Sequence, residues 1–134
     1  MRAATLIGVA RRIPAPVVRM VTASPARSVV LRSIFTRMPQ LLSPAGRKAT
    51  GVIRFDVTGR GRVDTWYVSL GGDRCVVGRH GPARPRATII VSAFDFVQLA
   101  TGTDPIRLFA DGRLRLSGDT YFGASVGAFF ALSP

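Results

Sequence analysis

A short motif near the end of the chain has the spacing of a serine hydrolase nucleophile elbow. Gly123-Ala-Ser-Val-Gly127 matches the Gly-x-Ser-x-Gly pattern, in which a sharp strand-to-helix turn exposes a serine hydroxyl. That chemistry also needs an acid and a histidine after the serine in the chain. No acid or histidine follows Ser125, and the single histidine, His80, comes earlier. The sequence therefore does not support a serine hydrolase.

Residues that could bind a metal or a nucleotide are too few or wrongly spaced. Cys75 and His80 are the only Cys and His in the chain, which is too few ligands for a closed zinc site. Gly59-Arg-Gly61 lacks the third glycine of a dinucleotide fingerprint, and Gly46-Arg-Lys48 lacks the flanking residues of a Walker A loop. We expect no catalytic residue, metal or cofactor. Several carboxylates are expected beside turns or on exposed faces, where turn formation accounts for them: Asp56, Asp64, Asp73, Asp111 and Asp119.

Basic residues are concentrated in the first part of the chain. The 134 residues have a net charge of +12, and residues 1–50 contain nine basic residues and no acid. A nucleic-acid partner is not expected, because the aromatic residues follow the spacing of a core and do not alternate with arginines. An anionic membrane surface fits better, since arginines mixed with apolar residues are typical of interfacial segments. The candidate membrane-surface residues are Arg11, Arg12, Arg19 and Arg27.

Residues 1–24 are interpreted as a basic, apolar leader that precedes one domain over residues 25–134. Met1-Arg2 and Ala3–Ala10 resemble a signal peptide only in part, because the apolar stretch is short and Arg11-Arg12 interrupts it. Cys75 can form no internal disulfide, which fits a reducing compartment. We therefore expect a cytoplasmic protein that can lie at the inner face of the membrane.

The first helix of the domain is predicted to start at Ser24-Pro25. Serine is a favoured N-cap, and proline is favoured in the first helical turn. One apolar helix face is then predicted from the spacing of Val30, Ile34 and Met38, flanked by Leu31 and Phe35. Pro39 is expected to end this helix.

The rest of the domain contains both the two-residue period of strands and the spacing of apolar helix faces. Alternation of apolar and polar residues predicts four strands joined by glycine turns, near residues 53–57, 65–70, 75–77 and 87–91. Two short helices are predicted to start near Ser92 and Asp104, followed by a strand at residues 113–116 and a last helix. This order predicts an α+β fold, a five-stranded, mostly antiparallel sheet covered on one face by helices.

The closing segment, Thr120–Pro134, contains no charged residue. An ordinary surface helix would carry charge on its outer face. One face holds large apolar residues such as Phe122 and Phe129, and the other is small, with Gly123 and Gly127. Two interpretations remain open. The helix is buried on all sides, or it meets an apolar cavity, a lipid, a membrane or a second subunit.

Several segments between residues 51 and 130 occur together in a recognisable order. Gly51-Val-Ile-Arg-Phe-Asp-Val57 and Trp66-Tyr-Val-Ser-Leu70 precede a strand-into-helix passage at residues 85–102. The most specific piece is Asp104-Pro-Ile-Arg-Leu-Phe-Ala-Asp-Gly-Arg-Leu-Arg-Leu-Ser-Gly-Asp119. On these segments, residues 51–130 resemble the sterol carrier protein 2 (SCP-2, sterol-binding) domain family, especially its bacterial stand-alone members.

The resemblance implies an apolar tunnel between sheet and helices and no catalytic residues. It implies binding and transfer or presentation of a sterol, fatty acid, acyl-CoA or isoprenoid lipid, by a monomer or homodimer. An alternative is a membrane-surface accessory or scaffold protein of a lipid-metabolic complex, docked through the basic N-terminal segment. Strand alternation and helix faces select the tunnel candidates: Trp66, Val68, Phe94, Leu99, Leu108, Phe109, Leu116, Phe122, Val126, Phe129 and Phe130.

Overall fold

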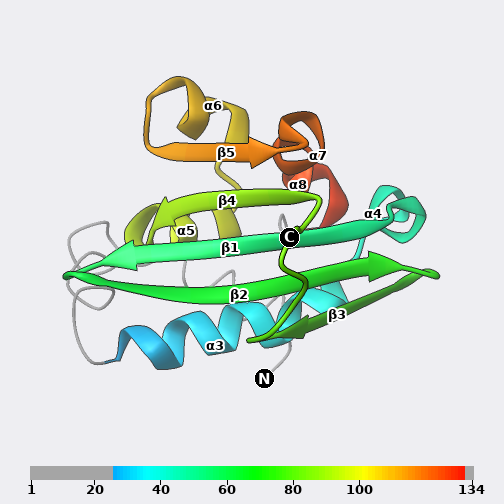
Figure 1. Cartoon of the computed structure of the whole chain (residues 1–134), viewed down its shortest axis with the longest axis horizontal. Helices are drawn as coiled ribbons and strands as arrows, with labels where there is room; N and C mark the ends of the chain where they lie inside the picture. The colour runs from blue at the N-terminus through cyan, green and yellow to red at the C-terminus, as the bar shows by residue number, and fades with distance from the viewer. Residues whose placement is uncertain (1–25, 132–134) are drawn as a thin grey trace.

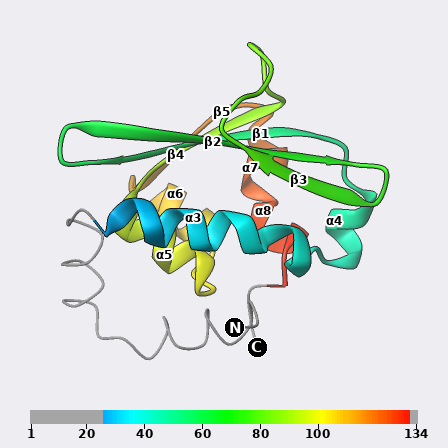
Figure 2. The same ribbon diagram turned by 90° about the horizontal axis from the view of Figure 1, so that it is seen from below.

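All the helices that the structure describes lie on one face of a five-stranded sheet (Figures 1 and 2). The computed structural model describes residues 26–131. Across the sheet the strands lie in the order β3-β2-β1-β4-β5. Their bounds are β1 (Gly51–Gly59), β2 (Arg62–Gly71), β3 (Arg74–Gly78), β4 (Ala87–Ser92) and β5 (Leu114–Gly118). The α+β prediction is confirmed, and each predicted strand is present.

Strand pairing is antiparallel except at the centre of the sheet. β1 pairs antiparallel with β2, β2 with β3, and β4 with β5, whereas β1 and β4 are parallel. The turns Arg60-Gly61 and Gly72-Asp73 both have positive φ at their two central residues. That conformation matches the twist of tight hairpins, so β1, β2 and β3 form a local meander.

Seven short helices join or cover the strands between residues 26 and 131. They are α3 (Arg27–Arg37), the 3₁₀ turn η1 (Met38–Leu41), α4 (Pro44–Lys48), α5 (Ala93–Ala100), α6 (Pro105–Ala110), α7 (Thr120–Ala124) and α8 (Val126–Phe129). η1 and α4 were not predicted; Ser43 starts α4 by accepting a hydrogen bond from the Gly46 N–H at 3.1 Å. The closing helix, predicted as one element, is divided at Ser125. Over this range no helix is long and apolar enough to cross a bilayer.

In the structure α3 begins at Arg27 with Ala26 as N-cap, and its predicted start, Ser24-Pro25, lies outside the described residues. The apolar face of the helix is centred on Leu31 and Phe35, which were predicted to flank it, and not on Val30 and Ile34. Its buried residues are Arg27, Leu31 and Phe35, while Val30 and Ile34 are half-buried. The face is rotated because the Arg27 guanidinium binds the carboxylate of Asp64 inside the protein, at 3.1 Å.

The core lies between the helices and the inner face of the sheet. Phe35 of α3 is stacked between two other rings, with centroids 4.7 Å from Trp66 and 4.6 Å from Phe96. This stack fills the space below the centre of the sheet. The inner faces of the three central strands are almost fully buried, at Ile53, Phe55, Val57, Trp66, Val68, Leu70, Ala87, Ile89 and Val91.

Candidate functional site

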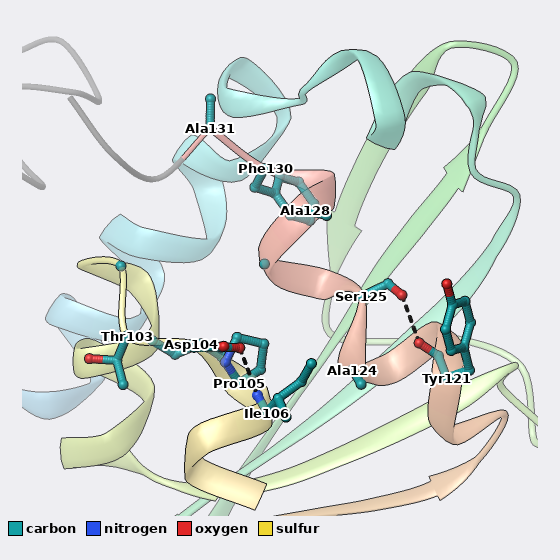
Figure 3. Close-up of a pocket in the computed structure, with 13 residues that line it drawn as sticks. Thr103, Asp104, Pro105, Ile106, Tyr121, Ala124, Ser125, Ala128, Phe130 and Ala131 are labelled. Atoms are coloured by element: carbon teal, nitrogen blue, oxygen red, sulfur yellow. Dashed lines mark hydrogen bonds between the residues drawn. The ribbon is translucent and has the colours of Figure 1, made fainter.

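A groove of about 610 Å³ opens between the α5–α6 connection and the closing helices (Figure 3). Two chain segments supply its walls, one from α5 to the start of α6 and one from α7 to the end of α8. The lining residues are mostly apolar or small: Leu99, Gly102, Thr103, Asp104, Pro105, Ile106, Tyr121, Ala124, Ser125, Gly127, Ala128, Phe130 and Ala131.

The polar side chains that line the groove mainly form hydrogen bonds with the backbone at helix ends. The Asp104 carboxylate accepts a hydrogen bond from the Ile106 N–H at 2.9 Å, which caps α6. The Ser125 hydroxyl donates to the Tyr121 carbonyl at 2.8 Å (Figure 3). Ser125 therefore lies at a helical break and not on the strand-to-helix turn that a nucleophile elbow requires.

The two glycines of the closing helices face different neighbours. A Cβ at Gly127 would lie 3.1 Å from the Cδ of Pro105, across the groove. A Cβ at Gly123 would lie 3.1 Å from Cδ2 of Leu116, on the sheet. Gly123 thus allows α7 to pack closely on the sheet, and Gly127 allows α8 to approach Pro105 closely at the groove. The small face of the closing segment is therefore accounted for by the sheet at one position and the groove at the other.

A second, much smaller space lies inside the core. This gap has a volume of about 20 Å³, roughly that of one water molecule, and is lined entirely by apolar side chains. Its lining comes from α3, η1, β1, α5, α8 and the residue after α8: Ile34, Met38, Phe55, Phe96, Leu99, Ala100, Val126 and Phe130. Leu99 and Phe130 line both the groove and the gap. These two side chains therefore form the wall between the groove and the apolar interior.

The position of Phe130 is fixed by the segment around α4. The Ser43 N–H donates to the Phe129 carbonyl at 2.9 Å, and the Ser43 hydroxyl donates to the Ala128 carbonyl at 2.5 Å. Leu42 and Phe130 form an isolated β-bridge. A Cβ at Gly46 would overlap the Phe129 carbonyl oxygen, so only glycine allows this close approach. The backbone of the closing segment is thus held from outside, while the Phe130 side chain points to the interior.

Only some of the predicted tunnel residues reach a cavity. Leu99, Val126 and Phe130 line the groove or the gap. Phe94 and Leu108 line a separate, more polar cleft of about 390 Å³ between α5 and α6. The others belong to the core or pack against it and line none of these three cavities: Trp66, Val68, Leu116, Phe122 and Phe129.

Two predicted site residues are corrected by the structure. Phe109 is 50% exposed, because α6 turns Pro105 and Leu108 to the core and Phe109 to solvent. Arg27 was expected at a membrane surface, but it is 3% exposed and bound to Asp64. The other membrane-surface candidates, Arg11, Arg12 and Arg19, lie outside the described residues.

Sequence reasoning missed much of the lining. Ile34 and Met38 had been placed on an apolar helix face, and that signal could have added them to the list. Thr103, Pro105 and Ala128 carry no periodic signal, because they lie in a loop or on the small side of a short helix.

The carboxylates near the site form ion pairs and cap helices. Asp95 is buried and binds Arg113, and this carboxylate raises the pKa of the Arg113 guanidinium. The Phe122 N–H, and then Arg86, lower the pKa of Asp119 at the start of α7. No group of three or more metal-binding side chains occurs in residues 26–131.

Asp64 was expected beside a turn or on an exposed face, and that expectation is wrong. It is 5% exposed. Its carboxylate lies 3.1 Å from Arg27, 3.1 Å from Arg62 and 3.9 Å from Arg79. Three arginines compensate its charge, so its burial is explained by ion pairing.

The fold is similar to those of several solved sterol carrier proteins. Sterol carrier protein 2 from Yarrowia lipolytica is 26% identical, with a TM-score of 0.56 over 70% of this chain and 91% of that one. Sterol carrier protein 2 like 2 from Aedes aegypti is 24% identical, with a TM-score of 0.59 over 75% and 93%. Sterol carrier protein 2 from Aedes aegypti, solved with the C16 fatty acid palmitate, is 20% identical, with a TM-score of 0.57 over 74% and 92%.

Comparison of sequences gives the family. Among curated proteins, none matches this chain. The model of the SCP-2 sterol transfer family matches residues 32–131, which include every strand and all of the groove and gap lining. The resemblance inferred from residues 51–130 is therefore confirmed over a longer stretch, and the chain belongs to the SCP-2 sterol transfer family.

Proposed function

We propose that the protein binds the hydrocarbon part of a lipid, without catalysis, in the apolar interior behind the groove. The observation that carries this proposal is the wall that Leu99 and Phe130 share between the open groove and the internal gap. Rotamer changes of side chains are common when a partner binds, so a change at Leu99 and Phe130 would open the wall to a ligand.

The sizes of the two spaces suit a ligand that enters in part. The groove lies within the usual range of small-molecule sites, about 300–1,000 Å³. The gap of about 20 Å³ is too small for an alkyl chain, so Phe130 and Leu99 would have to move as the chain enters. Each methylene that leaves water contributes about 0.8 kcal/mol, which favours such an exchange for a long chain.

Family membership and one solved relative support a fatty acyl ligand. The family is described as one of sterol transfer, and the Aedes aegypti sterol carrier protein was solved with palmitate. An apolar wall distinguishes sterols from acyl chains only weakly, because it offers few directional contacts. We take a C16 fatty acid as the first probe and a sterol as the second.

The test is binding of a fluorescent C16 fatty acid, together with native mass spectrometry after mild purification. We expect saturable binding and co-purified lipid. Ala128→Trp places a large ring in the groove and is expected to weaken binding roughly tenfold or more, since it removes the entry space. Ala45→Trp, on the exposed surface of α4, is the matched control. An empty protein that ignores both fatty acid and sterol would overturn the proposal, as would equal binding by the two variants.

A further inference from the structure

Three large apolar side chains lie exposed along one edge of the molecule. Ile106 and Phe109 of α6 are 59% and 50% exposed, and Tyr121 of α7 is 84% exposed. Figure 1 places α6 and α7 on the same edge, beside β5, and α3 on the opposite edge. We call these three residues the rim. Exposed apolar groups gathered on one edge mark interaction surfaces more often than scattered single ones do.

The rim is continuous with the groove. Ile106 and Tyr121 line the groove (Figure 3), and Phe109 follows Ile106 by about one helical turn on α6. The groove in turn ends at Leu99 and Phe130, the wall of the apolar interior. The groove, with its mostly apolar or small lining, therefore connects the rim with the wall of the core.

We propose that the rim is the surface by which this protein docks onto a phospholipid bilayer. The proposal rests on the proposed function, since it gives the route by which a lipid chain passes from the membrane to the groove without crossing water. Isoleucine and phenylalanine would enter the boundary between headgroups and acyl chains. Tyrosine is enriched at that boundary because its ring is apolar and its hydroxyl is polar.

Charge on this edge favours lipid phosphates as the partner. Arg107 of α6 and Arg115 of β5 are exposed, and neither has a carboxylate within ion-pair distance among residues 26–131. Guanidinium groups bind phosphates well, and their stems can cover apolar surface while the head stays at the interface. The nearby carboxylates Asp104 and Asp111 keep the net charge small, so apolar contact is expected to contribute most of the affinity. The oligomeric state of the wild type in solution distinguishes a bilayer from a second copy of the chain as the partner of the rim.

The rim does not include the arginines that were expected at a membrane surface. Arg27, the one of these four that the structure describes, is buried at the start of α3, and α3 lies on the opposite edge from α6 (Figure 1). Vesicles of pure phosphatidylcholine carry no net charge, so they report contact through the rim with little contribution from the basic segment.

The test is flotation of the full chain with phosphatidylcholine vesicles. Phe109→Ser is expected to weaken vesicle binding roughly tenfold, because it removes an apolar side chain from the interface. Val76→Ser is the matched control, since Val76 is 64% exposed but lies on β3, away from the rim. The docking proposal is overturned if wild-type protein does not float, if Phe109→Ser floats equally well, or if Val76→Ser loses as much. It is also overturned if the wild type is a dimer in solution and Phe109→Ser makes it a monomer.

A second measurement separates docking from ligand binding. Phe109 lines none of the three cavities, so Phe109→Ser should bind the fluorescent fatty acid from vesicle-free solution with wild-type affinity. If the wild type binds no fatty acid but vesicle binding still depends on Phe109, the proposed function fails while the docking surface stands. If fatty acid binds and vesicle binding ignores Phe109, the docking surface fails alone.

Discussion

Arg27 and Asp64 form an ion pair in the protein interior, with Nη2 and Oδ2 3.1 Å apart and side chains 4% and 7% exposed. Arg27 also donates to the Gly59 carbonyl at 2.6 Å and to the Val57 carbonyl at 2.8 Å. The first turn of α3 is thereby fixed to the hairpin of β1 and β2. A charge that sequence patterning assigns to a surface is part of the core.

Replacing Arg27 by methionine should therefore destabilise the fold strongly. Arg27→Met leaves the Asp64 carboxylate buried with only the partly exposed Arg62 and Arg79 nearby, and it leaves two backbone carbonyls without their donor. Breaking a buried pair from one side costs about 3–5 kcal/mol of unfolding free energy. Urea denaturation followed by far-UV circular dichroism measures the change.

The matched control is the pair between Arg54 and Asp56, which has a similar length of 3.0 Å but side chains 37% and 16% exposed. Arg54→Met should cost less than about 1 kcal/mol, because water screens the pair. Equal losses from Arg27→Met and Arg54→Met would show that burial of Arg27 does not set its contribution.

Gly46 should tolerate no side chain. In Gly46→Ala the new methyl would overlap the Phe129 carbonyl oxygen, so α4 and the closing segment must separate. We expect a loss of roughly 2–3 kcal/mol, typical of overpacking against backbone. Gly78→Ala is the control, since a Cβ there meets no atom within 4 Å. Thermal unfolding of both variants decides the point; a Gly46→Ala protein as stable as Gly78→Ala would contradict the close approach.

Phe130 and Phe129 offer a comparison of two adjacent rings. Both are buried, and truncation to alanine should cost each variant about 3–5 kcal/mol. Only Phe130 lines the gap and the groove, so only Phe130→Ala should join the two spaces and admit benzene or xenon. Crystals soaked with xenon would report the new cavity. Xenon at the same place in Phe129→Ala would mean that Phe130 is not the wall.

The single cysteine should be unreactive at neutral pH. Burial raises the pKa of the Cys75 thiol from an ordinary 9.0 to about 11. Only the thiolate reacts with iodoacetamide, so alkylation of the folded protein should rise with a midpoint near pH 11. Alkylation of urea-unfolded protein should rise two units lower and provides the reference. A midpoint near pH 9 in the folded protein would contradict the shift.

The same group makes stability fall at high pH. Between pH 9 and about 11 the unfolded chain releases the Cys75 proton while the folded chain retains it. Unfolding is therefore favoured as the pH rises through this window. Below pH 9 both states hold the proton, and the contribution is constant. Cys75→Ala should unfold with a weaker pH dependence between pH 9 and 11, which denaturant titration at several pH values would measure.

The order of strands and short helices was predictable because each carries a local signal. Alternation at Ile53, Phe55 and Val57 marks one buried sheet face, and the caps Ser92 and Asp104 mark helix starts that the structure contains. These signals depend on a few neighbouring residues, so no knowledge of the partners was needed. The helix α4 was missed because its five residues are too few to show a period.

The sequence pattern could not predict which residues pair across long stretches of the chain. Arg27 looked like a surface residue, because arginine is rarely buried unless it is paired, and its partner Asp64 is far along the chain. For the same reason the centre of the apolar face of α3 was placed on Val30 and Ile34, with Leu31 and Phe35 as flanking residues, whereas the structure buries the flanking pair most deeply.

The candidate site was predictable only in part, because a hydrophobic pattern shows which residues are buried but not what they touch. In the sequence, Trp66 and Phe130 both lie on apolar faces of their predicted elements, so the pattern predicts burial for each of them equally. Trp66 is covered by the ring of Phe35, whereas Phe130 borders two cavities. The width of the groove depends on the distance between the α5–α6 connection and Gly127 of α8. The spacing of apolar residues in the sequence gives no information on that distance.

The hydrogen bond from Ser43 to Ala128 joins residues 85 positions apart. A connection of this sequence separation is slow to form, because the entropy of closing so long a loop is lost before the contact is gained. The β1–β2–β3 meander depends on local contacts and can form first, whereas the contacts that cover Phe55 and Leu99 with residues 126–130 need this long loop to close. Refolding is therefore expected to be limited by the docking of the closing segment onto the segment around Ser43.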